Sequence, residues 1–223
     1  MTLRMVTKEQ HIPGKRLGRH VLHDPKSRKF PAPVKDIASV NWPRHVPIFN
    51  QDDLGSCTGN AATGCVSSGP FSVKGTEEMA VKVYSAATRL DRIRGVYPPE
   101  DTGSSGLAAM KALKNMGLID GYSHAFGLEH VLGALTISPG ITGITWLTGC
   151  DEPDSDGIVT YDGTVRGGHE VEIIGCDADN ELVWFANSWG KNWGKDGYFA
   201  MSWEDYDKAL KARGDATFPM VPQ

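Results

Sequence analysis

The sequence predicts an α+β protein in which helices come first and strands follow. Apolar residues repeat at helical spacing in the first half, whereas the second half holds short apolar or alternating runs that are typical of strands. The 26 glycines fall largely at strand ends and turns, which favours a loop-rich α+β fold over a helical bundle. With 223 residues, the chain can form one large domain or two modest ones with a real core.

The N-terminal segment differs from the rest in charge. Residues 1–45 hold ten Lys and Arg against three acids, while the whole chain has a net charge of -4. Five prolines argue for an extended segment without its own core. We expect a basic arm over 1–37. It could contact a nucleic acid or an acidic partner, or lie across the acidic body as a self-inhibitory strap. The third alternative is a solvated tail.

The body is expected over 38–223, with a helical part at about 50–136 and a β part at about 137–223. A helix from Thr76 to about Arg92 begins at a threonine cap and has two glutamates in its first turn. The next helix, capped by Ser104 or Ser105, ends before Gly117. Shorter helices are predicted at 127–135 and 203–212. Strands are predicted at 141–147, 158–161, 169–176, 182–188 and 198–202.

Composition and motifs argue against several classes of protein. No run of 18 apolar residues occurs, so no membrane span is expected, and no Sec signal is seen at the N-terminus, which predicts a cytoplasmic or virion-associated protein. The four cysteines form no C-x-x-C pair, so neither a metal nor a cofactor is predicted. Cys65 is expected in the core, and Cys150 could pair with Cys176. The acids at 151–156 resemble part of a calcium loop, but Gly163 stands where its bidentate Glu belongs, so we expect an acidic surface turn.

Three separated stretches carry the chemistry of a cysteine nucleophile. Cys57 follows a Gly-Ser pair and opens a run of small residues, which predicts a thiol at the positive end of a helix. His169 lies in a strand-like run and is the candidate base, and Asn187 can fix its tautomer. Gln51, six positions before Cys57, offers an amide to the oxyanion beside the Cys57 backbone N–H.

These residues resemble the papain-like cysteine peptidases. The resemblance rests on Gln51, Cys57 and His169 in that order, and on the run from Asn187-Ser188-Trp189-Gly190 to Phe199. It implies a helical left subdomain and an antiparallel β-barrel-like right subdomain, with the active-site cleft between them. It also implies Cys57 as nucleophile, His169 as base and acid, Asn187 as orienter, Gln51 as oxyanion donor, and a polypeptide as substrate.

The resemblance further implies a substrate groove. A glycine-rich wall matches Gly103, Ser104 and Ser105, where an extended peptide pairs with the backbone. Gly168 and Glu170 flank the base, and Glu170 matches a pocket position, for which we expect tolerance of a basic or polar substrate side chain. Trp189 is expected to cover the His169–Asn187 hydrogen bond.

The chain departs from the family pattern at several positions. Thr58 replaces the usual Trp after the nucleophile, Leu54 stands where extracellular members have a disulfide cysteine, and Asp52 and Asp53 place negative charge near the thiol. One rival hypothesis is a papain-like shell that serves as a structural or binding component, for instance of a virus particle. A cell-wall amidase or a transglutaminase-type enzyme is the other. The short arm and small size resemble bacteriophage-encoded members.

Overall fold

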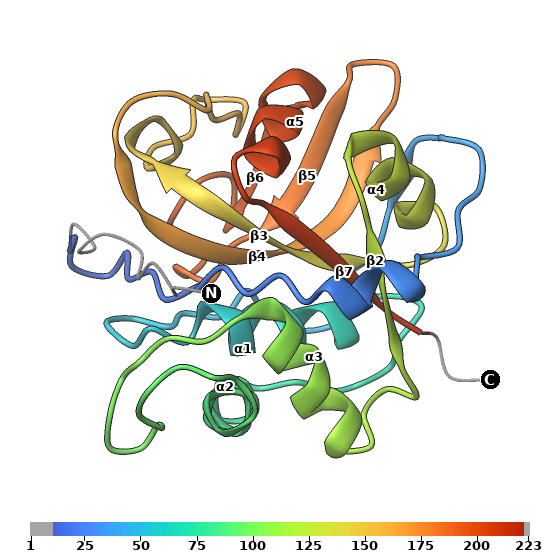
Figure 1. The fold of residues 1–223 in the computed structure, drawn as a ribbon. Coiled ribbons are helices and arrows are strands. Elements are labelled where there is room, and N and C mark those ends of the chain that lie inside the picture. Colours follow the sequence, from blue (N-terminus) through green and yellow to red (C-terminus); the bar gives the residue numbers. More distant parts are fainter. Residues whose placement is uncertain (1–10, 221–223) are drawn as a thin grey trace.

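The computed structural model describes residues 11–220, which form two halves with the N-terminal arm between them (Figure 1). One half consists of three helices. The other is an antiparallel sheet with two helices packed on it. The helices are α1 (Cys57–Val66), α2 (Glu77–Leu90), α3 (Gly106–Asn115), α4 (Leu128–Leu135) and α5 (Trp203–Lys211), with 3-10 turns η1 (Pro25–Lys29) and η2 (Thr148–Cys150).

The sheet has the order β2-β7-β3-β4-β5-β6, and β1 pairs with β4 beside this path. The strands are β1 (Val40–Asn41), β2 (Tyr122–Ala125), β3 (Gly140–Leu147), β4 (Val165–Asp177), β5 (Leu182–Ala186), β6 (Tyr198–Ser202) and β7 (Asp215–Pro219). All of these pairings are antiparallel. The predicted α+β class, with a helical half and an antiparallel β half, is confirmed.

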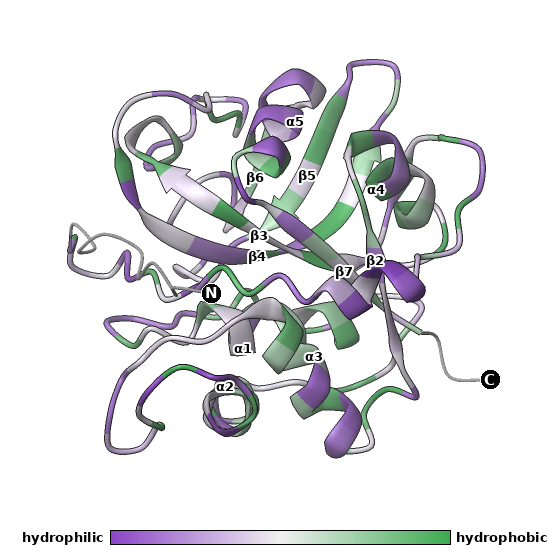
Figure 2. Cartoon of the chain, viewed as in Figure 1, coloured by the Kyte–Doolittle hydropathy of each residue, from purple (hydrophilic) through white to green (hydrophobic). Residues whose placement is uncertain are grey.

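Each half has its own apolar core. The helical core joins α1, α2 and α3, and the other core fills the space between the sheet, α4 and α5. Figure 2 shows α5 as mostly hydrophilic, and only its Tyr206 and Ala209 are buried, as expected for a helix that covers a core with one face. Among the described residues 11–220, none of the helices combines the length and the apolar character that a membrane span requires.

The predicted helix ends have the expected caps. The Thr76 side chain accepts from the Met79 N–H at 3.2 Å and starts α2, and the Ser105 side chain accepts from the Ala108 N–H at 3.3 Å and starts α3. Gly117, just beyond α3, has a φ of 71°, the left-handed conformation that ends many helices.

Three expectations need correction. Residues 158–161 are not a strand, because only Ile158 forms a bridge, to Ala200, and the Tyr161 N–H donates to the side chain of Asp205 instead of a neighbouring strand. Strands β2 and β7 were not expected; each is short, and they pair with each other across almost a hundred residues. Because β2 and α4 belong to the sheet half, the division at residue 136 lies too late in the chain.

All four cysteines are buried, and none of them forms a disulfide. Cys65 lies in the helical core, as expected. Cys150 and Cys176 do not pair: the Cys150 Sγ lies 3.8 Å from the Thr160 carbonyl oxygen, and the Cys176 Sγ 3.2 Å from that of Ala38.

Candidate active site

Cys57 is the first residue of α1, a helix that is buried along its whole length. The Asn60 side chain donates to the carbonyl oxygen and hydroxyl of Ser56 at 3.0 and 2.9 Å, which fixes the turn at the start of the helix. Gly59 lets α1 approach α2 closely, since a Cβ there would lie 2.3 Å from the Ala80 carbonyl oxygen. The Cys57 sulfur thus lies at the positive end of a rigidly held helix, which favours the thiolate.

His169 faces α1 from β4. Its Nε2 lies 2.8 Å from the Asn187 Oδ1, which also accepts from the Ser188 N–H at 2.8 Å. Because Oδ1 can only accept, Nε2 carries the proton and Nδ1 is the free base. Nδ1 is buried and has no hydrogen-bond partner within residues 11–220. The imidazole therefore has the tautomer that can take a proton on its other side.

Two tryptophans hold the imidazole in place. The Trp189 ring stacks on His169 with centroids 4.8 Å apart and an interplanar angle of 23°, and the Trp146 ring meets it edge-on at 4.9 Å and 82°. Trp189 was predicted here. Trp146 was missed, although it was expected on a strand, because only the pairing of β3 with β4 brings it beside His169.

Burial is the largest influence on the imidazole. It lowers the pKa of His169 to about 3, the Arg166 charge acts in the same direction, and the hydrogen bond to Asn187 opposes both. With the arm in place, His169 is therefore neutral at neutral pH.

We expect this shift to make stability depend on pH. The unfolded imidazole binds a proton below about pH 6.5 but the folded one only near pH 3, so the free energy of unfolding falls as pH drops through that interval. At pH 5 the loss from His169 is about 2 kcal/mol. Arg166 and its partner Asp151 are the nearby charges. Urea denaturation at pH 7 and pH 5 should show a larger loss in the unaltered chain than in His169→Gln; equal losses would contradict the shift.

Gln51 is anchored at both ends of its amide. Its Nε2 donates to the Leu54 carbonyl oxygen at 2.7 Å, and its Oε1 accepts from the Ser188 hydroxyl at 2.6 Å. Nε2 keeps a second N–H for a ligand. Asp52 and Asp53 are exposed: Asp52 accepts from the Asn50 amide at 2.6 Å and Asp53 lies beside the arm, so neither charge is buried against the thiol.

We predict that Gln51→Ala, in a chain whose N-terminal arm is displaced by the Gly18→Val substitution described below, lowers kcat on the order of 10²-fold. The change in KM should be smaller, because an oxyanion donor acts in the transition state. Gln51→Glu should also be slow, because it removes the donor and adds charge. Steady-state kinetics on one peptide measure both. An effect confined to KM would assign Gln51 to substrate binding instead.

The loop before Cys57 is tied to the opposite rim. The Asp101 carboxylate accepts from the Gly55 N–H at 3.0 Å and from the Tyr84 hydroxyl at 2.6 Å, and that hydroxyl accepts from the Gly103 N–H at 2.9 Å. Burial and Asp101 together raise the pKa of Tyr84, so the phenol stays a donor. Sequence reasoning missed Asp101 and Tyr84 because nothing in their local pattern marks them.

The arm runs between the two halves, as the blue chain in Figure 1 shows. The N–H groups of Gly18 and Arg19 donate to the Gly168 carbonyl oxygen at 3.2 and 2.9 Å. On the other side, the His20 N–H donates to the Ser104 carbonyl oxygen at 2.7 Å, and the Ser104 N–H donates to the Gly18 carbonyl oxygen at 2.9 Å. Extended backbone thus pairs with both walls of the groove.

The remaining predicted binding residues lie along this path. The Trp189 indole donates to the Arg16 carbonyl oxygen at 3.1 Å, and Glu170 faces Arg19. Gly103 has a φ of 68° and would clash with the Gly18 carbonyl oxygen if it carried a Cβ. The Ser105 side chain instead caps α3. The structure therefore brings the predicted residues to one groove, with Ser105 supporting its wall.

Cys57 begins a buried helix and lies opposite a strand that carries His169, in a fold with a helical half and a sheet half. This arrangement is that of the papain-like fold. Residues 154–218 match the model of the papain family cysteine proteases. The chain has the papain-like fold. This segment contains His169 and Asn187 but not Cys57, so Cys57 is placed by the fold.

Similar proteins agree with this class. Cathepsin B-like CP2 of Giardia intestinalis is 51% identical over 45 residues, which are 19% of this chain and 15% of that protein's length. Xylellain, a cysteine protease from Xylella fastidiosa, has a TM-score of 0.74 at 17% identity and covers 97% of this chain and 100% of its own. Procathepsin L 3 of Tenebrio molitor larval midgut has a TM-score of 0.63 at 15% identity and covers 93% and 77%. These relatives give the bacteriophage expectation no support.

Proposed function

We propose that the chain is a cysteine peptidase that hydrolyses peptide bonds through a Cys57, His169 and Asn187 triad. The observation that carries this proposal is the His169–Asn187 hydrogen bond, which leaves Nδ1 as a buried free base on a strand that faces the helix of Cys57. The match to the papain family over 154–218 supports it, because that segment holds two of the three residues.

The reaction follows from these roles. The Cys57 thiol gives its proton to the His169 Nδ1, and the thiolate attacks the substrate carbonyl carbon. The oxyanion accepts hydrogen bonds from the Gln51 Nε2 and the Cys57 N–H. His169 then protonates the leaving amine as the C–N bond breaks, which leaves a thioester. A water molecule, deprotonated by His169, attacks the thioester, and the acid is released as Cys57 regains its proton.

We propose also that the arm keeps this form latent. The arm takes the hydrogen bonds of Ser104 and Gly168 that a peptide substrate would use. Procathepsin L 3, by its name a precursor, is similar in fold over 93% of this chain and 77% of its own, which is compatible with an arm of this kind.

The charges of the arm favour a strap over a nucleic-acid contact. Three of its basic side chains face acids of the body: Lys15 lies 3.9 Å from Glu152, Arg16 lies 3.7 Å from Asp101, and Arg19 pairs with Asp215. Cations engaged in this way are not available for phosphates without opening the structure.

The test uses Gly18→Val to displace the arm, because a Cβ at Gly18 would lie 2.2 Å from the Gly55 carbonyl oxygen. Lys29→Ala, an exposed arm position, is the matched control. An epoxysuccinyl peptide should label Cys57 stoichiometrically in Gly18→Val, and this variant should hydrolyse a mixed peptide library. The Lys29→Ala chain should stay as slow as the unaltered one. If the Gly18→Val chain folds and Cys57 is labelled but no peptide is cleaved, the result would instead support a papain-like shell that serves as a structural or binding component with little turnover.

A further inference from the structure

Arg19 is an arginine of the arm whose guanidinium is completely buried in the body. Its Nη2 donates to the Arg213 carbonyl oxygen at 2.9 Å and to the Asp215 carboxylate, and its Nε lies 3.9 Å from a Glu170 carboxylate oxygen. Removing a guanidinium from water costs several kcal/mol unless charge and hydrogen bonds replace the water. Two acids and a carbonyl from the body supply that replacement.

The room for this side chain is made by glycines on different elements. A Cβ at Gly143, on β3, would lie 2.2 Å from the Arg19 Nε, and one at Gly168, on β4, would lie 2.2 Å from the Arg19 carbonyl oxygen. On α3, a Cβ at Gly106 would lie 2.3 Å from a Glu170 carboxylate oxygen. Both halves of the body thus have a glycine where a larger residue would collide with Arg19 or Glu170.

Arg19 leaves several polar atoms of the pocket without a hydrogen bond. Neither carboxylate oxygen of Glu170 has a hydrogen-bond partner within the described residues, and the Arg19 Nε and Nη1 have none either, although all are buried. Burial and the nearby Asp215 raise the pKa of Glu170, and Arg19, at 3.9 Å, opposes this only in part. A guanidinium about 1 Å closer to Glu170 would hydrogen-bond its carboxyl group. The arm therefore fills the pocket without saturating it.

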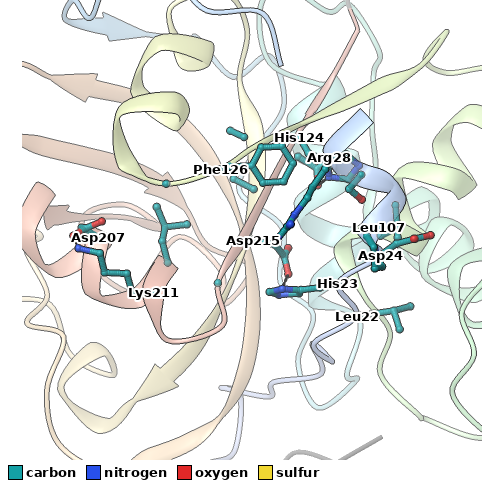
Figure 3. Close-up of a pocket in the computed structure, with 18 residues that line it drawn as sticks. Leu22, His23, Asp24, Arg28, Leu107, His124, Phe126, Asp207, Lys211 and Asp215 are labelled. Carbon is teal, nitrogen blue, oxygen red and sulfur yellow. Dashed lines mark hydrogen bonds and ion pairs between the residues drawn. The ribbon is translucent and has the colours of Figure 1, made fainter. Parts of the chain in front are cut away.

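One side of the pocket is buried and the opposite side is partly exposed to solvent. Glu170 is fully buried, whereas the Asp215 side chain is 28% exposed and its carboxylate lies 3.6 Å from the His23 Nε2. Figure 3 shows Asp215 and His23 side by side at the edge of a cavity of about 520 Å³ that also adjoins Arg28 and Phe126. A side chain can therefore leave or enter the pocket on the Asp215 side.

We propose that this pocket, formed by Glu170, Asp215 and the Arg213 carbonyl, is an arginine-recognition site of the substrate groove, which Arg19 occupies in place of a substrate side chain. The proposal rests on the peptidase function above and names its substrate class: polypeptides with an arginine at the position that pairs with Ser104 and Gly168. A guanidinium reaches both acids from two sides, whereas the single ammonium of a lysine reaches one, so arginine is favoured over lysine.

The first experiment measures this preference in the full-length Gly18→Val chain. Cleavage of a peptide library, read by mass spectrometry, should show arginine enriched at one position relative to the cut. At that position, kcat/KM for arginine should exceed that for citrulline, its neutral isostere, on the order of 10²-fold, and should also exceed that for lysine. Added Glu170→Gln should remove most of the preference, whereas Glu204→Gln, an exposed acid, should not change it. Cleavage without arginine enrichment would overturn the proposal and leave the peptidase function intact.

The second experiment needs no turnover. Arg19→Ala empties the pocket in the full-length chain, and ethylguanidinium should then raise Tm in a saturable way, more than ethylammonium at the same concentration. The effect should be absent in the unaltered chain and in Arg19→Ala with Glu170→Gln. If both cations raised Tm equally, the proposal that the pocket recognises arginine would be overturned. Ethylguanidinium could stabilise the chain specifically even though Cys57 is not labelled and no peptide is cleaved. That result would overturn the peptidase function but would leave the proposed arginine recognition intact.

Discussion

Cys57→Ala in the arm-displaced Gly18→Val chain will lower kcat on the order of 10⁶-fold, because the thioester cannot form and the remaining groups provide only binding and oxyanion stabilisation. The substitution removes one buried sulfur at the start of α1 and leaves the helix in place. Hydrolysis of a fluorogenic peptide, followed over days, measures the residual rate.

Cys65→Ala is the matched control. It removes a buried thiol on the same helix, eight residues further along and in the helical core. Burial is the main cause that raises the pKa of Cys65, so this thiol stays protonated and inert. Its loss should lower stability but not kcat. Equal activity losses in the two variants would remove Cys57 from the role of nucleophile.

Arg44→Ala will destabilise the fold by about 3–5 kcal/mol, because it leaves the Glu172 carboxylate buried without a counter-charge. Glu172, on β4, accepts from Arg44 and, at 2.5 Å, from the Ser68 hydroxyl, and its side chain is fully buried. For a chain of this length Tm should fall by roughly 6–20 °C. Calorimetry measures the change. The double variant Arg44→Met with Glu172→Leu should regain much of the loss, since the pair is then replaced by apolar groups.

The Arg44→Ala defect should also depend on pH. Burial raises the pKa of Glu172 and Arg44 opposes that effect, so the pKa rises further without the arginine. A folded pKa above the unfolded one favours the folded state below about pH 4.5 and loses that advantage as pH rises through the folded value. The defect should therefore be smaller in acid than at neutral pH. A defect that grows in acid would contradict the ion pair.

Residues with a regular local pattern were predictable from sequence. The α2 helix shows its apolar spacing and its Thr76 cap, and both appear in the structure. Cys57, His169, Asn187 and Gln51 were predicted as site residues because their order and spacing match a known arrangement. In these cases the local sequence determines the local geometry.

What sequence reasoning missed depends on contacts between distant residues. Strands β2 and β7 contain four and five residues; β2 pairs with β7, and β7 also pairs with β3, so both depend on partners far away in the sequence. Trp146 reaches His169 only through the register of β3 and β4. The surplus charge of the arm was visible, but the acids that it meets at Glu170 and Asp215 lie about 150 and 200 residues away and come together only in the folded chain.

We propose that Cys57 and His169 act as one thiol–imidazole pair. The most direct measurement is the rate of Cys57 alkylation by iodoacetamide against pH in Gly18→Val, with and without His169→Ala. We expect the chain with His169 to react down to well below pH 8.5, the ordinary pKa of a cysteine, and the His169→Ala chain to lose this reactivity. Identical pH profiles in the two chains would contradict the account.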